Sequence, residues 1–104
     1  MIVWSEKLYI GGQAEKHSEK VQKKLQKGKP VIGYFLITRP SNEKNLFDIL
    51  PAAELLFPYY KRQELMVYGL AKGREEAEAL VVSMLEDVYR ETGGLGCKEY
   101  FETE

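Results

Sequence analysis

The chain has 104 residues, of which 44% are hydrophobic and 30% are charged, and its 15 Lys and Arg nearly balance its 16 Asp and Glu to give a formal net charge of -1. This length is typical of one domain, and this composition is typical of folded proteins and excludes a disordered chain. The small net charge argues against a strongly basic nucleic-acid-binding protein. We therefore expect residues 1–104 to form a single domain.

Single copies of cysteine and histidine narrow the possible chemistry. Because Cys97 is the only cysteine, an internal disulfide and a multi-cysteine metal site are excluded. Because His17 is the only histidine, a two-histidine metal site is excluded as well. The first residues lack a signal-peptide pattern, and no apolar run approaches the ~20 residues of a membrane-spanning helix. We expect a cytoplasmic protein that uses no metal or other cofactor and does not bind a membrane.

The first part of the chain predicts a strand followed by a helix. Residues 2–10 are rich in β-branched and aromatic residues and stop at Gly11 and Gly12, which predicts one strand or two short ones. Residues 13–27 contain no Pro or Gly, are rich in Lys, Gln and Glu, and are followed by Gly28, so they favour a helix. Few of their positions are apolar, and most of this helix should therefore face water.

The middle of the chain is rich in strand signals. Residues 31–38 predict a strand that is apolar on both faces. Residues 46–50 can return as a second strand, and residues 51–57 then favour a short helix that ends before Pro58. Residues 65–71 predict a further strand that is again apolar on both faces.

The strongest helix signal covers residues 74–92. From Ala77 onward, apolar residues recur at i, i+3, i+4, i+7, i+8 and i+11, which predicts an amphipathic helix with one buried face. Gly93 and Gly94 follow its last turn and favour its end there. Residues 95–101 then predict a short edge strand.

The order of these elements predicts the fold class. Strand, helix, strand, followed again by strand, helix, strand, is the split β-α-β order of ferredoxin-like folds, here with residues 39–63 inserted between the halves. We therefore expect an α+β two-layer sandwich, with a mixed or antiparallel sheet of roughly four or five strands and two long helices on one face. Strands 2–10 and 65–71 would then be parallel neighbours, and the turns after them would open at one edge.

Two helices on one face would leave the other face of the sheet uncovered, although both central strands are apolar on both sides. Residues 46–60, a second copy of the chain or a partner could cover it. We expect a homodimer, alone or together with residues 46–60. The predicted contact surface consists of Tyr34, Tyr59, Tyr60 and Tyr68.

Two strand-to-helix turns predict an alternative function, the binding of a small anion or a nucleotide. They combine free backbone N–H groups with two cations, an arrangement that attracts anions. The residues concerned are Gly11, Gly12, Lys72, Gly73 and Arg74. Their spacing is not that of a Walker or dinucleotide-binding motif, and Glu75 and Glu76 directly after the second turn would repel a phosphate.

Charge is uneven along the chain. Residues 15–29 contain six lysines against two glutamates, a net charge of +4, whereas residues 74–104 have a net charge of -6. We expect two solvated helix faces that attract each other. The alternative is a basic helix face that binds an acidic partner or nucleic acid.

Neither nucleic-acid binding nor catalysis has a specific signal. Residues 58–62 place two aromatic residues beside two cations, but residues 64–70 lack the pattern of RNA-recognition motifs. No spacing of carboxylates requires acid-base chemistry, and Cys97 has no second cysteine to resolve it. The sequence therefore predicts a non-catalytic binding or interaction domain.

Overall fold

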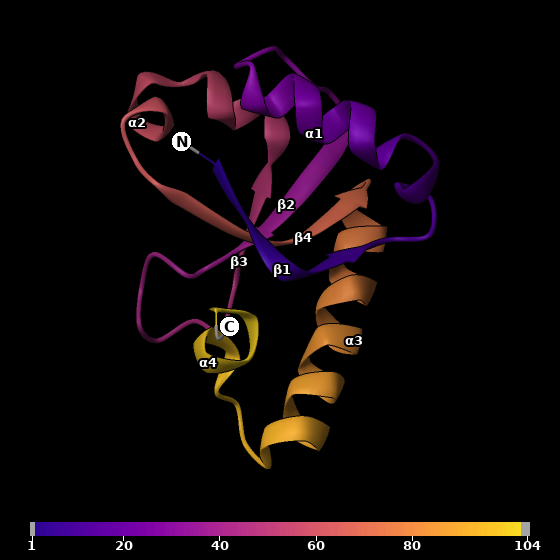
Figure 1. Cartoon of the computed structure of the whole chain (residues 1–104), viewed down its shortest axis with the longest axis vertical. Coiled ribbons are helices and arrows are strands. Elements are labelled where there is room, and N and C mark those ends of the chain that lie inside the picture. The colour runs from indigo at the N-terminus through magenta and orange to yellow at the C-terminus, as the bar shows by residue number, and fades with distance from the viewer. Residues whose placement is uncertain (1, 103–104) are drawn as a thin grey trace.

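The computed structural model describes residues 2–102, apart from the side chain of Lys61. This part of the chain forms both strands and helices (Figure 1). In chain order they are β1 (Ile2–Ile10), the 3₁₀ helix η1 (Glu15–His17), α1 (Ser18–Gln26), β2 (Tyr34–Thr38), β3 (Asp48–Pro51), the 3₁₀ helix η2 (Ala52–Leu56), α2 (Pro58–Lys61), β4 (Leu65–Lys72), α3 (Arg74–Thr92) and α4 (Cys97–Glu102).

The strands form a mixed sheet in the order β1-β4-β2-β3. β1 runs parallel to β4, with Ile2 opposite Leu65 and Ile10 opposite Leu70, which confirms the predicted pairing of these two segments. β2 is antiparallel to both of its neighbours, β4 and β3. The carboxyl ends of β1 and β4 therefore lie at the same edge, as the sequence predicted.

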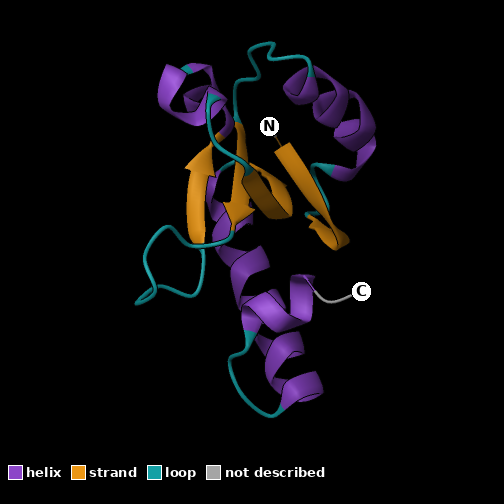
Figure 2. Cartoon of the chain, turned by 60° about the vertical axis from the view of Figure 1, so that its left-hand side comes forward, coloured by secondary structure: helices purple, strands orange, loops and turns teal. Residues whose placement is uncertain are grey.

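Helices cover both faces of this sheet (Figures 1 and 2). Leu36 and Ile37 are neighbours on β2, so their side chains point to opposite faces. Leu36 packs in one cluster with Leu25 of α1, and Ile37 packs in a second cluster with Met84 of α3. The expected two-layer, ferredoxin-like sandwich with both long helices on one face is therefore corrected, because α1 and α3 lie on opposite sides.

The segment after β2 also differs from its predicted form. β3 includes Pro51, which we had expected at the start of a helix, and the helix that follows is the 3₁₀ helix η2. The short helix ends before Pro58, as predicted, and Pro58 itself occupies the first turn of α2, where its missing N–H needs no intrahelical partner. Ala52 of η2 is buried in the same cluster as α1, so this segment helps α1 to cover one face.

A β-bulge in β4 allows α3 to approach the sheet closely. Ile37 lies opposite Gly69 while Thr38 lies opposite Val67, so Tyr68 is an extra residue in β4. A Cβ on Gly69 would lie 3.1 Å from Ile37 Cδ1 and 3.3 Å from the Met84 sulfur. Glycine therefore fits this crowded point of the strand.

α3 has the bounds that the apolar periodicity predicted. Ala77, Met84 and Val88 are its buried residues, at the spacing of one helix face. Gly93 follows in the left-handed conformation at φ 75°, and its N–H donates to the Tyr89 carbonyl over 2.8 Å. No helix among residues 2–102 combines the length and the apolar character that crossing a membrane requires.

The C-terminal segment is a helix, and the predicted edge strand at residues 95–101 is wrong. Cys97 and Phe101 are four residues apart and are the buried residues of α4. The Phe101 ring stacks on that of Tyr68 with their centroids 4.5 Å apart, and its carbonyl accepts a hydrogen bond from Ser5 Oγ over 2.6 Å. α4 thus packs on the α3 side of the sheet instead of extending it.

Candidate functional site

The two predicted glycine turns lie next to each other at one edge of the sheet. The Gly11 N–H donates to the Leu70 carbonyl over 2.9 Å, and the Gly73 N–H donates to the Gly33 carbonyl over 2.8 Å. Lys72 and Arg74 are exposed there, and Arg74 Nε lies 3.5 Å from Glu78 of its own helix. The residues of the predicted anion site are therefore neighbours at this edge.

An internal carboxylate fills the space between these turns. Glu76 Oε1 accepts hydrogen bonds from the backbone N–H of Gln13 over 2.9 Å and of Ala14 over 3.4 Å, and Glu76 Oε2 accepts one from Lys72 N–H over 3.3 Å. These are the groups that an external phosphate would use. The chain's own Glu76 thus takes the position of the anion.

The four predicted contact tyrosines do not form one surface. Tyr68 is fully buried and donates a hydrogen bond to Glu102, so it lies beneath α4 and away from any partner. Tyr34 packs against the cluster on the other face of the sheet, beside α1. The prediction that Tyr34 and Tyr68 share an exposed face is corrected, because helices of the same chain cover the side chains of β2 and β4 on both faces of the sheet.

Tyr59 and Tyr60 of α2 do lie at the surface. Their rings meet edge to face with centroids 5.0 Å apart, and Tyr59 is 62% exposed. Tyr60 is partly buried, and this burial, together with Glu54, raises the pKa of its phenol. The pair therefore belongs to the molecular surface at the end of the sheet that carries α1, η2 and α2.

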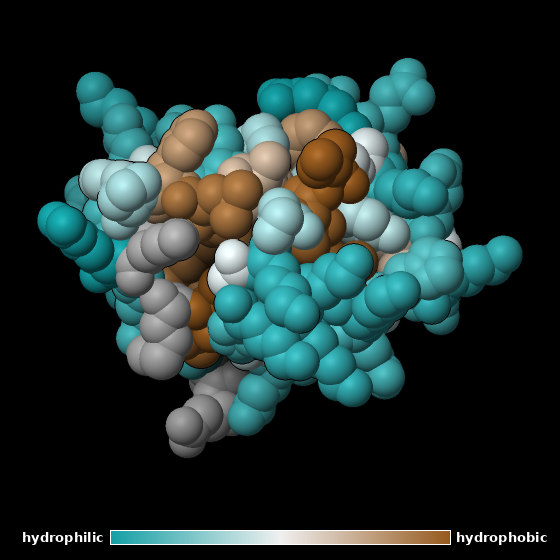
Figure 3. Space-filling model, turned by 90° about the horizontal axis from the view of Figure 1, so that it is seen from above, coloured by the Kyte–Doolittle hydropathy of each residue, from teal (hydrophilic) through white to brown (hydrophobic). Residues whose placement is uncertain are grey.

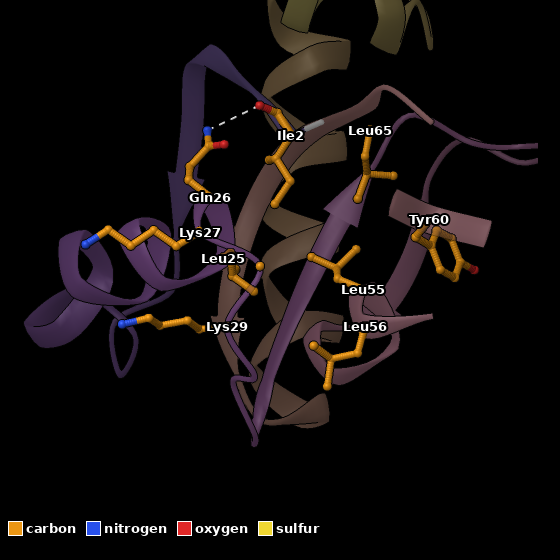
Figure 4. A pocket seen from close by; sticks show the side chains of 10 residues that line it. Ile2, Leu25, Gln26, Lys27, Lys29, Leu55, Leu56, Tyr60 and Leu65 are labelled. Atoms are coloured by element: carbon orange, nitrogen blue, oxygen red, sulfur yellow. Dashed lines mark hydrogen bonds between the residues drawn. The ribbon is translucent and has the colours of Figure 1, made fainter. Parts of the chain in front are cut away.

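A hollow of about 480 Å³ opens between α1 and the η2-α2 segment. Its volume falls in the range of about 300–1,000 Å³ that is typical of binding clefts. Figure 4 shows Leu25, Leu55 and Leu65 around its centre, with Tyr60 on the far side from α1. We call this hollow the α1-η2 groove, and its apolar lining consists of Ile2, Leu25, Leu55, Leu56, Tyr60 and Leu65.

The surface around the groove is apolar in the middle and hydrophilic at its margins. Viewed from above, apolar side chains gather over this end of the molecule and polar ones surround them (Figure 3). Leu56 is 39% exposed, and the adjacent Phe57 is 58% exposed. Exposed apolar side chains that adjoin an apolar hollow indicate a candidate binding surface.

Lysines form the α1 side of the groove. Lys27 and Lys29 line it, and their side chains extend outward from the wall, away from Tyr60 (Figure 4). Along α1, Lys20, Lys23 and Lys24 are also exposed. Among residues 2–102, the ion pairs join arginines to carboxylates, and none includes a lysine of α1 or of the loop after it. The expected attraction between the basic and acidic helix faces therefore forms no ion pair here.

Two polar clusters elsewhere hold α3 and α4 on the sheet. The Arg39 guanidinium pairs with Glu102, with Nε 2.8 Å from Oε2, and lowers the pKa of that carboxyl, with Tyr68 as a further donor. On the other side of α4, Tyr9 donates to Asp87 over 2.6 Å and lowers the pKa of its carboxyl. Both clusters therefore join elements that are distant in sequence.

The remaining reactive groups offer no assembled chemistry. Burial raises the pKa of the Cys97 thiol, which makes it a weaker nucleophile. His17 is exposed on the polar side of η1. Within the described part of the chain, no three His, Cys, Asp or Glu side chains gather in a group that could hold a metal ion.

The sequence interpretation missed the groove. Its strongest signal is the run Leu55, Leu56 and Phe57 within the short helix predicted at residues 51–57, but the sequence does not show which of these side chains stay accessible. The contribution of Ile2 and Leu25 depends on tertiary contacts and had no local signal. No protein-family model, curated protein or solved structure matches this chain.

Proposed function

We propose that this chain is a non-catalytic interaction module that binds a protein segment in the α1-η2 groove. The observation that carries the proposal is the accessible apolar hollow between α1 and η2, continued on the surface by Phe57 and Tyr59. A leucine side chain of a partner that moves from water into the groove would contribute up to roughly 1.5–3 kcal/mol. Tyr60 and Tyr59 add aromatic area of the kind that dominates protein interfaces.

The polar clusters support a structural role rather than a catalytic one. Glu102, Asp87 and Glu76 are each engaged by groups from another part of the chain. A general base or nucleophile has to face a substrate in a cleft, whereas these carboxylates hold elements together. The single buried thiol suits a reducing compartment, and we place the module in the cytoplasm.

A second copy of the chain is the second candidate partner. The exposed Phe57 and Tyr59 would be the centre of a two-fold interface. The original reason for a dimer, an uncovered face of the sheet, no longer applies, since α1 with η2 and α3 with α4 cover the two faces. Sedimentation velocity at micromolar concentration separates the two candidates.

In the alternative function, an external anion would have to compete with the Glu76 carboxylate for the same N–H groups. An external phosphate would need to displace a carboxylate that accepts hydrogen bonds from Gln13 and Lys72. Repulsion by the same carboxylate disfavours a doubly charged ligand. We therefore rank it below protein binding.

Selection of peptides on the full chain tests the proposed function. A display library of random short peptides is selected on the immobilised protein, and each selected peptide is tested against Leu56→Glu. Val82→Glu is the matched control, because Val82 is 57% exposed on α3, on the opposite side of the sheet. The proposal expects peptides that lose binding to Leu56→Glu and keep it with Val82→Glu. Two results would contradict the proposal. One is a set of selected peptides that bind Leu56→Glu as tightly as the wild-type chain, and the other is a wild-type dimer that Leu56→Glu dissociates.

A further inference from the structure

We infer that the occupant of the α1-η2 groove is an acidic amphipathic segment of another protein, which inserts apolar side chains between Leu25 and Leu55 and places carboxylates against the lysines of α1 and of the loop that follows it. This inference rests on the proposed function, since it names the chemistry of the ligand for the same groove. The groove provides the apolar contacts to such a segment, and the lysines provide the charged contacts.

The apolar half follows from the lining. Leu25, Leu55 and Leu65 surround the centre of the hollow, so an apolar side chain that enters there is favoured over a polar one (Figure 4). Gln26, whose Nε2 donates to the Ile2 carbonyl over 3.2 Å, and the loop through Gly28 line the groove on the α1 side. An occupant therefore places aliphatic or aromatic side chains in the hollow and its polar groups at the rim.

The charged half follows from the distribution of lysines. Lys27 and Lys29 stand at the edge of the groove, and Lys23 and Lys24 continue the positive surface along α1. None of these four lysines lies within ion-pair distance of a carboxylate in residues 2–102. A segment that carries carboxylates on the α1 side of its apolar residues would therefore complement both the shape and the charge.

The same charges disfavour the other occupants. Two copies meeting groove to groove would bring two lysine faces together, and this repulsion opposes a two-fold dimer at this surface. A nucleic acid would pair with the lysines, but it would leave the apolar hollow and Leu56 uncovered. A peptide with both apolar side chains and carboxylates would cover the apolar hollow and also pair with the lysines.

Charge reversal of the rim tests the inference. The peptides selected on the wild-type chain are measured against the double variant Lys27→Glu/Lys29→Glu, and each is also synthesised with its acidic residues replaced by lysine. We expect the original peptides to lose about tenfold or more in affinity for the double variant. The lysine-substituted peptides should show the opposite preference. Affinity for the wild-type chain should fall as salt rises, because salt screens exposed charges.

The outcomes separate this inference from the proposed function. Peptides that depend on Leu56 but carry no excess of acidic residues, or that bind both charge states of the rim equally, would overturn the inference and leave the proposed function standing. If no selected peptide loses binding to Leu56→Glu, both the proposed function and this inference are contradicted. An oligouridylate that binds the wild-type chain more tightly than every selected peptide would overturn the inference in favour of nucleic acid. Circular dichroism of each variant confirms that the chain is folded.

Discussion

The carboxylate of Glu76 lies against Gly11, where an added Cβ would be 1.8 Å from Glu76 Oε1. Gly11 follows β1, and Glu76 lies in the first turn of α3, which follows β4, the parallel neighbour of β1. The first turn of α3 therefore places a negative charge against the turn that follows β1. The turn that the sequence marked as an anion site is thus closed by a side chain of the chain itself.

Replacing Gly11 with alanine should displace Glu76 and destabilise the fold. The side chain can swing away, but it then loses its hydrogen bonds to Gln13 and Ala14, and we expect a loss of about 1–3 kcal/mol in the free energy of unfolding. Urea denaturation measures this loss. Gly12→Ala is the matched control, because nothing lies within 4 Å of a Cβ added there.

The coupling of Gly11 and Glu76 gives a second readout. Glu76→Ala removes the side-chain atoms that a Cβ at position 11 would meet, so the destabilisation by Gly11→Ala should shrink in the Glu76→Ala background. Additive effects of the two substitutions would show that the Gly11 effect arises elsewhere.

Inorganic phosphate should raise the melting temperature of Glu76→Ala by more than it raises that of the wild-type chain. In the wild-type chain the N–H groups of Gln13 and Lys72 already have an acceptor, whereas the variant frees them for an external anion. Thermal unfolding in phosphate, with chloride at equal ionic strength as the control, measures the difference. A wild-type increase with phosphate equal to that of the variant would restore the anion-binding alternative.

Phe101→Ala should cost about 3–5 kcal/mol in the free energy of unfolding, because Phe101 is 2% exposed and stacks on Tyr68. Tyr89→Ala is the control: Tyr89 is an exposed aromatic residue on α3, and its removal should change stability by only about 0.5 kcal/mol. Equal effects of the two substitutions would contradict the packing of α4 on the sheet.

The contrast between α3 and α4 shows what the sequence could predict. α3 is long, and its apolar periodicity is repeated often enough to identify a helix and its buried face. α4 has six residues, and its only helical signal is the pair Cys97 and Phe101 at i and i+4. The aromatic residues at its end favoured a strand locally, and packing on Tyr68 decided the outcome.

The candidate site was partly predictable. The parallel pairing of β1 and β4 followed from the order of elements, and it brought Gly11 and Gly73 to one edge as expected. Which face each helix covers did not follow, because strands that are apolar on both sides accept helices on either. The groove depends on that choice, since α1 forms one of its walls.

Stability should fall in acid through Glu102. Its pKa is lowered in the folded chain, chiefly by Arg39 and then by Tyr68, so the contribution of the carboxylate is present above its unfolded value of 4.5 and is lost as the pH falls through the lower folded value. Glu102→Gln should cost about 1–3 kcal/mol at neutral pH. This difference between wild type and variant should shrink as the pH is lowered below 4.5. Denaturation curves over this pH range measure it, and a difference that stays constant would contradict the pairing with Arg39.

The most direct test of the central claim is a methyl NMR spectrum of the full chain, recorded while the tightest selected peptide is added. If the α1-η2 groove binds the partner, the methyl groups of Leu25, Leu55, Leu56 and Leu65 should shift together, and those of Leu80 and Leu85 on α3 should stay in place. Shifts confined to the α3 leucines, with the groove leucines unchanged, would contradict the account.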